Sequence, residues 1–249
     1  MLDIKNLTVR YGGNSPILNG ISLTLPKGIT VLIGQNGAGK STLLRAILGE
    51  VSYTGSIFAS GKDLSQTPPR ERARLLSLLP QQLPAPALSS AEVISLGFAP
   101  YVTRLGDRER QTVRDILQRL GITQLAERPV STLSGGERQK VFLGMLLAQD
   151  TPILLLDEPT THMDATAVRE LREILLAEAA RGKQILLVMH DLGEALSLAD
   201  HVLLLENARI AFDGTPQACI EQKVPEKHFG LSHYTARAEN GEVLHFYKV

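Results

Sequence analysis

One segment of eight residues, 34–41, constrains the fold more than any other: it has the order glycine, four residues, glycine, lysine, serine. The apolar run 29–33 precedes it and is typical of a buried strand, and residues 42–48 have a helical pattern that Gly49 would end. A loop between a strand and a helix directs backbone N–H groups and the positive end of the helix dipole at one point. Its glycines let the backbone approach a phosphate closely. The segment therefore predicts a phosphate-binding loop.

The lysine and serine at the end of this segment complete the predicted site. Lys40 would reach the β- and γ-phosphates of a nucleotide, and the Ser41 hydroxyl would bind Mg²⁺. An ordinary glycine-rich turn is the alternative, and the flanking strand and helix argue against it. The candidate nucleotide-binding residues here are Gly34, Gln35, Asn36, Gly37, Ala38, Gly39, Lys40, Ser41 and Thr42.

Length, charge and cysteine content limit the class of protein. A chain of 249 residues is long enough for one large domain, or for a core with a subdomain. The 26 basic residues equal the 26 acidic ones, so we expect no nucleic-acid partner, because such binding depends on neutralising phosphates. Cys219 is the only cysteine, which excludes an internal disulfide. No apolar stretch approaches the ~20 residues that span a bilayer, and the N-terminus lacks the pattern of a secretory signal. We therefore expect a soluble protein whose membrane span, if needed, comes from another chain.

Strand and helix patterns alternate along much of the chain. Short strands are predicted near residues 2–7, 21–25 and 55–58, and buried strands at 153–156, 184–189 and 202–205. Asp164 would cap the helix after the first buried run, and Gly182 would end it. Repeated strand–helix units predict a parallel, twisted sheet with helices on both faces.

A mostly helical stretch interrupts this pattern. Pro80, Pro84 and Pro86 break regular structure and predict a joint. Ser89 then opens a helix with a capping box, and another helix begins at Asp107. Residues 85–148 are therefore predicted to form a helical subdomain inserted into the core.

Acidic residues and a histidine follow two of the predicted buried strands. Asp157 ends the first and suits a Mg²⁺ ligand acting through a bound water, while Glu158 could polarise an attacking water. His190 ends the next strand and could bond the γ-phosphate and the water. A helix-capping acidic pair and a structural histidine are the alternatives.

A second candidate anion site lies at residues 133–137, Leu-Ser-Gly-Gly-Glu, before a helical run that is predicted to start near Arg138. A serine and two glycines before a helix can bind an anion. A plain helix cap by Ser134 or Ser131 is the alternative.

Taken together, these motifs make the chain resemble the ATP-binding cassette family, the ATPase subunits of ABC transporters. The resemblance extends from residue 2 to about 215 and rests on the phosphate loop, the signature motif 133–137, Asp157 with Glu158, and His190. It implies an α/β fold: a P-loop NTPase (RecA-like) core with an antiparallel β subdomain and an inserted α-helical subdomain. Residues 1–84 and 149–225 would form the core with the N-terminal β subdomain, 85–148 the helical subdomain with the signature, and 226–249 a C-terminal tail.

The resemblance also implies roles for single residues. Glu158, His190 and Gln81 would be catalytic, Ser41, Gln81 and Asp157 would hold Mg²⁺, and Tyr11 would stack on adenine. Gln81 would also couple the site to a permease, although Gln82 adjoins it and could be the coupling residue instead. Met163 stands where the family usually has leucine, a swap that conserves volume. The remaining residues implied to contact ATP are Ser134, Gly135, Gly136, Glu137 and Asp164.

The implied assembly is a head-to-tail homodimer in which each ATP lies between one copy's phosphate loop and the other's signature. Asp164 would lie on a loop that crosses the dimer interface. The dimer would sit on the cytoplasmic face of the inner (plasma) membrane, bound to transmembrane permease subunits and, through them, to a periplasmic or surface substrate-binding protein.

The closer resemblance is to importers of iron–siderophore complexes, haem and vitamin B12, and rests on residues 76–82 and 146–162. The alternatives are a soluble ABC ATPase acting on ribosomes or nucleic acid, an ABC ATPase for another cargo, and a regulatory module without turnover, against which Glu158 and His190 argue. Residues 216–249 indicate no role, and their aromatic residues are predicted to pack in the core: Phe229, Tyr234, Phe246 and Tyr247.

Overall fold

A six-stranded sheet forms the centre of the computed structural model, which describes residues 1–12, 15–161, 163–237 and 243–248. The strand order is β10-β9-β3-β8-β7-β6. All pairings are parallel except that of β10 with β9 at one edge. The bounds are β3 Gly28–Ile33, β6 Leu76–Leu79, β7 Ile153–Asp157, β8 Gln184–Val188, β9 His201–Glu206 and β10 Arg209–Gly214. The predicted α/β fold with a parallel sheet is confirmed.

The central sheet is buried on both faces, as its apolar runs predict. In β7, Leu154 and Leu156 belong to one hydrophobic cluster, whereas Ile153 and Leu155 belong to another. Successive side chains of a strand point to opposite faces, so the two clusters lie on either side of the sheet. Helices α6 and α7 pack on the first face and α1 on the second, with bounds α1 Lys40–Leu48, α6 Ala165–Ala180 and α7 Leu192–Leu198.

The second cluster also contains a small antiparallel sheet of order β2-β1-β4-β5. Its strands are β1 Leu2–Val9, β2 Leu18–Thr24, β4 Thr54–Ala59 and β5 Lys62–Asp63. In β1, Leu2, Ile4 and Leu7 are buried against α1, and this apolar face gives the β subdomain its core. The antiparallel β subdomain of the prediction is confirmed.

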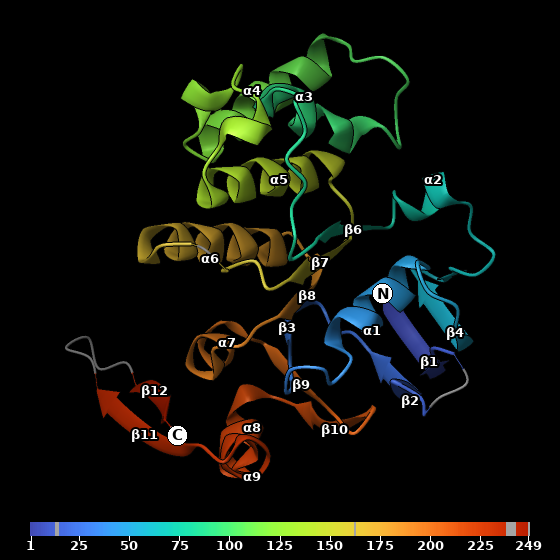
Figure 1. The fold of residues 1–249 in the computed structure, drawn as a ribbon, viewed down its shortest axis with the longest axis vertical. Helices are drawn as coiled ribbons and strands as arrows, with labels where there is room; N and C mark the ends of the chain where they lie inside the picture. Colours follow the sequence, from blue (N-terminus) through green and yellow to red (C-terminus); the bar gives the residue numbers. More distant parts are fainter. Residues whose placement is uncertain (13–14, 162, 238–242, 249) are drawn as a thin grey trace.

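The helical stretch packs above α6 in Figure 1 and follows a connection without helix or strand at residues 80–89. Its main helices are α3 Ser90–Ser95, α4 Asp107–Arg119 and α5 Gly135–Gln149, and the short α2 Pro69–Arg72 precedes them. Ser89 caps α3 with the predicted capping box. The predicted start of α5 near Arg138 is wrong: the helix begins at Gly135, because Ser134 caps it and places both glycines in its first turn.

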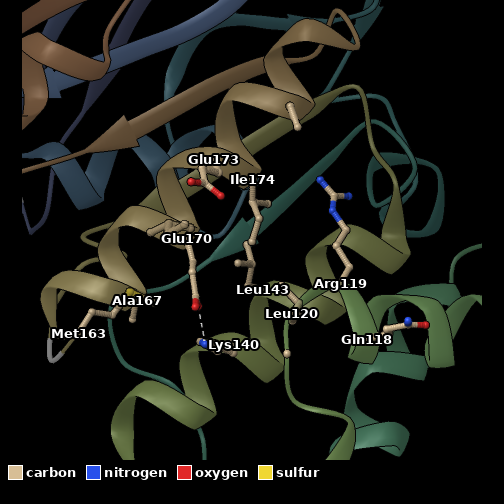
Figure 2. Close-up of a pocket in the computed structure, with 13 residues that line it drawn as sticks. Gln118, Arg119, Leu120, Lys140, Leu143, Met163, Ala167, Glu170, Glu173 and Ile174 are labelled. Carbon is tan, nitrogen blue, oxygen red and sulfur yellow. Dashed lines mark hydrogen bonds and ion pairs between the residues drawn. The ribbon is translucent and has the colours of Figure 1, made fainter. Parts of the chain in front are cut away.

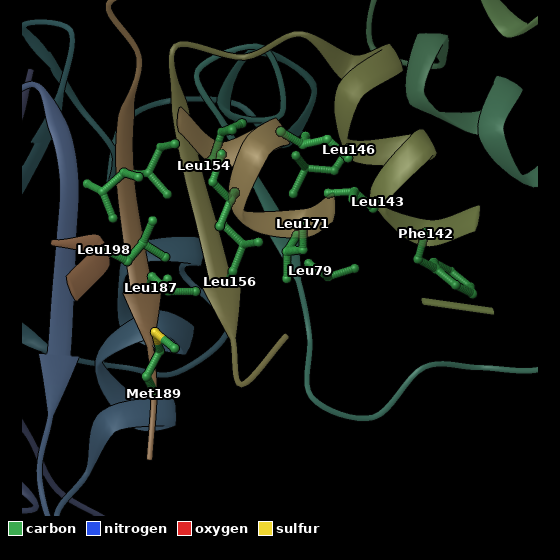
Figure 3. Close-up of a cluster of buried hydrophobic side chains, with 14 of the residues drawn as sticks. Leu79, Phe142, Leu143, Leu146, Leu154, Leu156, Leu171, Leu187, Met189 and Leu198 are labelled. Carbon is green, nitrogen blue, oxygen red and sulfur yellow. The ribbon is translucent and has the colours of Figure 1, made fainter. Parts of the chain in front are cut away.

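Leucine side chains join the helical layer to the central sheet. Figure 3 shows Leu143 and Leu146 of α5 meeting Leu154 and Leu156 of β7, with Leu79 at the end of β6. Strand β6 itself escapes prediction because it has four residues, one of them the buried Ser77, whose hydroxyl lies 2.9 Å from that of Thr151. The sheet's edge therefore depends on a polar pair as well as on apolar packing.

The tail consists of α8 Pro216–Glu221, α9 Val224–Phe229 and a hairpin of β11 Ser232–Arg237 with β12 Val243–Lys248. Phe229 and Tyr247 pack against the first cluster as predicted, whereas the packing prediction for Tyr234 is wrong, since its side chain is 57% exposed on β11. The side chain of Phe246 lies outside the described residues. Among the helices of the described ranges, none has the length and apolar character needed to cross a membrane.

Candidate functional site

The phosphate loop runs from the end of β3 into α1, where the sequence predicts it. Gly37 and Gly39 have φ angles of 78° and 105°, a backbone region that side chains disfavour. A Cβ on Gly34 would come within 2.4 Å of the Leu205 carbonyl oxygen. The glycine spacing therefore follows from backbone geometry and from the close approach of β9.

Lys40, the first residue of α1, lies folded over this loop. Its Nζ donates to the carbonyl oxygens of Gly34 at 2.7 Å and Gln35 at 3.2 Å, and only 6% of the residue is exposed. Burial lowers the pKa of Lys40, and the charges of Glu158 and Asp157 oppose this. The ammonium is thus held beside the loop by weak neutral acceptors that an anionic phosphate can replace.

A cavity of about 420 Å³ lies in front of the loop, and we call it the phosphate-loop cavity. It brings residues from five parts of the chain together: Ile17, Asn36, Gly37, Gly39, Lys40, Ser41, Thr42, Gln81, Glu158 and His190. Gln35 and Ala38 line an adjoining hollow of about 540 Å³ that shares Asn36 and Gly37 with it. Tyr11 and Gln82 line neither space, and Tyr11 is 44% exposed.

Glu158 is the centre of a polar group at the carboxyl ends of three neighbouring strands. Its Oε2 accepts a hydrogen bond from Gln81 Nε2 at 2.6 Å, and its Oε1 lies 2.5 Å from His190 Nε2. These three residues follow β7, β6 and β8 respectively. Glu158 has a φ of 50°, a costly conformation for a non-glycine residue that is found at functional sites. Gln81 rather than Gln82 is the glutamine that faces this carboxylate.

Asp157, the last residue of β7, is a buried carboxylate with an unused oxygen. Its side chain is 8% exposed, and Oδ1 has no hydrogen-bond partner among the described residues. Burial raises the pKa of Asp157, and a hydrogen bond with Ser41 opposes that shift. A buried carboxylate oxygen beside a hydroxyl is a fitting pair of hard oxygen ligands for Mg²⁺, which binds through one or two such groups together with phosphates.

The signature motif occupies a different part of the surface. Ser134 Oγ accepts from the Glu137 backbone N–H at 3.3 Å, and the Glu137 carboxylate accepts from the Ser134 N–H at 2.9 Å. The hydrogen bonds to Ser134 lower the pKa of Glu137. Both candidate uses of Ser134, helix cap and anion site, fit this geometry, because the cap leaves Gly135 and Gly136 in the first turn of α5.

Ser134, Gly135, Gly136 and Glu137 line a hollow of about 650 Å³, the signature hollow, together with Asp164. This hollow shares no lining residue with the phosphate-loop cavity. A single chain therefore brings together the phosphate loop, Gln81, Glu158 and His190, but it does not bring the signature to them.

Asp164 caps α6 as predicted, with Oδ1 accepting from the Ala167 N–H at 2.8 Å. Met163 packs, partly buried, against the first hydrophobic cluster, while its neighbour His162 lies outside the described residues.

Links between the helical layer and the core were missed by the sequence analysis. Gln139 of α5 is 6% exposed and donates to the Pro159 carbonyl oxygen at 2.5 Å, which ties the signature helix to the segment after Glu158. Lys140 bonds Glu170 of α6 at 2.6 Å across a hollow of about 370 Å³ (Figure 2). In the sequence, the signal for this contact is that Gln139 is a polar residue among the apolar residues of α5.

The chain is similar to known proteins over most of its length. Residues 18–161 match the family model described as ABC transporter. The hemin import ATP-binding protein HmuV of Pseudomonas entomophila is 39% identical over 239 residues, which cover 93% of each chain. The petrobactin import ATP-binding protein FpuD of Bacillus anthracis is 36% identical over 237 residues, 92% of this chain and 86% of that protein.

Solved structures show the same fold. One is described as the ATP-binding subunit of an ABC transporter. It matches with a TM-score of 0.82 and 26% identity, and the match covers 90% of this chain and 93% of that structure's chain. Another, a dimeric ATP-binding cassette in a post-hydrolysis state bound to ADP and Pi, has a TM-score of 0.78 at 23% identity over 87% of this chain and 99% of its own. The chain belongs to the ABC transporter family and is an ATPase of that family.

Proposed function

We propose that the chain is the ATP-hydrolysing subunit of an importer that takes up an iron–siderophore complex or a related chelate, haem or vitamin B12, through a separate membrane permease. ATP hydrolysis is supported by one observation: the side chain of Glu158 bonds those of Gln81 and His190 in the cavity that Lys40 also lines. The relatives, whose names include hemin and petrobactin import, support this cargo class over a ribosomal, nucleic-acid or other role.

In the proposed reaction, this chain's residues bind and orient ATP and the attacking water. Lys40 leaves the carbonyl oxygens of the loop for the β- and γ-phosphates, while the N–H groups of the phosphate loop surround them. Glu158, held between Gln81 and His190, accepts the proton of the water as the water oxygen bonds the γ-phosphorus and the bond from that phosphorus to ADP breaks. His190, which lines the same cavity, would bond the γ-phosphate.

Ser41, Asp157 and Gln81 are the residues that would hold Mg²⁺. When bound, Mg²⁺ neutralises charge that develops on the phosphates. The unpartnered Oδ1 of Asp157 supports this assignment, because a buried carboxylate oxygen without a partner is costly unless a ligand uses it.

The proposed catalytic unit is a head-to-tail homodimer. The separation of the signature hollow from the phosphate-loop cavity supports it, because Ser134, Gly135 and Gly136 do not line the phosphate-loop cavity of their own chain. In the dimer, the N-terminal N–H groups of the partner's α5 would stabilise the γ-phosphate charge. Glu137 holds the cap that aims them, and Asp164, on the rim of the same hollow, would lie at the interface.

Two further parts of the proposal concern contacts outside the cavity. Tyr11, exposed in the segment that leads from β1 toward Ile17, would stack on adenine. Beside the helical layer, Leu88 and Leu96 are 40% and 50% exposed, close in sequence to Gln81. The surface beside Gln81 and the helical layer, where these leucines are exposed, would receive a cytoplasmic helix of the permease.

Such docking places the chain peripherally on the cytoplasmic face of the inner membrane, with a substrate-binding protein as an indirect partner. We also propose the division into a core of 1–84 and 149–225, a helical subdomain of 85–148 and a tail of 226–249. The grouping of α3, α4 and α5 above α6 supports the helical unit, and the boundary at 226 falls inside α9.

Proteoliposomes test the function. Affinity purification of the chain from detergent-solubilised membranes should recover a polytopic permease, and the reconstituted pair with its binding protein should take up ⁵⁵Fe-labelled siderophore only with Mg²⁺ and ATP. Glu158→Gln is the inactive control. ATP hydrolysis that the permease does not stimulate, together with no uptake of siderophore, haem or vitamin B12, would overturn the importer assignment.

A further inference from the structure

The C-terminal tail contacts the phosphate loop directly. Gln35 Nε2, from the second residue of the loop, donates to the His228 carbonyl oxygen of α9 at 3.1 Å, across 193 positions of sequence. The tail is therefore part of the loop's immediate surroundings, although its sequence indicates no role in nucleotide binding.

The side chain of His228 secures this contact to the central sheet. Its Nδ1 lies 3.0 Å from Oε2 of Glu206, the last residue of β9, and the two side chains are 26% and 29% exposed. In the tautomer with the proton on Nδ1, the ring donates this hydrogen bond to the carboxylate. Leu205, next to Glu206, has the carbonyl oxygen that approaches Gly34. Three segments are therefore in mutual contact: the end of β9, the start of the phosphate loop and α9.

Buried side chains fix α9 in this place. Val224 and Pro225 are buried at its start, Phe229 packs on the core at its end, and Gly230 closes it in a left-handed conformation. Farther along the tail, β12 lies against α7, the helix that Asp191 caps directly after His190 (Figure 1). The tail therefore contacts the phosphate loop and the helix that begins directly after His190.

We propose that His228 is a positioning residue for ATP binding: by bonding Glu206 and accepting from Gln35 it holds the phosphate loop in its nucleotide-binding shape. A loop that is already ordered loses less conformational entropy when the phosphates bind. His228 touches no nucleotide and acts only through Gln35. The inference rests on the proposed function of the phosphate loop in binding ATP.

The test compares ATP affinity in three variants of the full chain. His228→Leu removes the ring N–H, and the Kd for the analogue AMP-PNP with Mg²⁺ should rise about three- to tenfold, the size expected for one lost, partly exposed hydrogen bond. The kcat at saturating ATP should stay within about twofold. His228→Asn keeps a donor near the position of Nδ1 and should restore most of the affinity.

The chain contains a matched control at the other end of the same strand. His201, the first residue of β9, lies 2.6 Å from Asp213, and among the described residues no hydrogen bond or ion pair joins either side chain to the phosphate loop. His201→Leu removes the same kind of interaction and should leave the Kd for AMP-PNP unchanged. An equal loss of affinity in both leucine variants would show a general structural effect and overturn the proposal.

Hydrogen exchange tests the same proposal on the wild-type chain, so its result does not depend on whether a variant folds. If α9 orders the loop, nucleotide binding must order α9 in return, so AMP-PNP should slow amide exchange over residues 224–230. If AMP-PNP protects the phosphate loop but leaves exchange over residues 224–230 unchanged, only the proposed role of the tail is overturned. A wild-type chain with no protection anywhere and no measurable Kd would instead overturn the proposed ATP site.

Discussion

The phosphate-loop cavity and the signature hollow both lie at the glycine-containing start of a helix, yet they are organised in opposite ways. In the cavity, Glu158 bonds Gln81 and His190, which are 77 and 32 positions away in sequence. In the hollow, Ser134 and Glu137 bond each other within a single helical turn.

The two sites therefore depend on different levels of structure: the cavity on the folded core, and the signature motif on a local helix cap. The cavity needs side chains from several strands, so it exists only when the core is folded. The signature motif on the wall of the hollow needs only a capped helix end with access to solvent to bind an anion, and a second copy of the chain could use it as it stands. The proposed dimer therefore joins an assembled catalytic centre to a locally built anion site.

The largest expected effect comes from removing the ammonium group of Lys40 from the phosphate-loop cavity. Lys40→Ala should abolish measurable ATP binding and turnover, because the phosphates lose the ammonium that the loop holds for them. Isothermal titration with AMP-PNP measures this, and a melting curve checks the fold. ATP affinity equal to wild type would show that the cavity does not depend on Lys40.

A smaller but still large effect should follow from neutralising the central carboxylate. Glu158→Gln should lower kcat by at least ~10²-fold, the low end for a positioned proton-transfer group. ATP-bound dimers should still form, since the phosphate loop is unchanged. Steady-state hydrolysis with light scattering measures both, and near-normal turnover would mean that another acid accepts the proton.

The signature hollow can be blocked without touching the cavity. Ser134→Arg should prevent ATP-driven dimer closure and lower kcat by roughly 10²-fold, the usual loss when a donor to developing charge is removed. Ser131→Arg, three residues upstream and also exposed, is the matched control and should dimerise normally. Normal dimers of the Ser134 variant under light scattering would refute the contact between copies.

The smallest effect concerns stability. Because burial raises the pKa of Asp157, its charged form destabilises the nucleotide-free fold above the usual aspartate pKa. Asp157→Asn should therefore raise Tm at pH 7 by about 2–4 °C, the shift that ~1 kcal/mol produces in a chain of this size. The gain should shrink as the pH falls through the raised pKa. A lower Tm for the variant at pH 7 would contradict this account.

The sequence determined the parts of the molecule that depend on short-range physics. The glycines of the phosphate loop, the apolar run of β7, and the caps at Ser89 and Asp164 follow from backbone conformation, burial and hydrogen bonds between near neighbours. The same local rules gave the alternation of strands and helices in most of the core, although not β6, and with it the α/β fold class.

Only the tertiary structure decided which distant groups meet. It turned Gln81 instead of Gln82 toward Glu158, kept the signature away from its own phosphate loop, and placed His228 beside Gln35. Such contacts depend on the twist of the sheet and on how helices and tail pack over it, and no local pattern of residues encodes these distances.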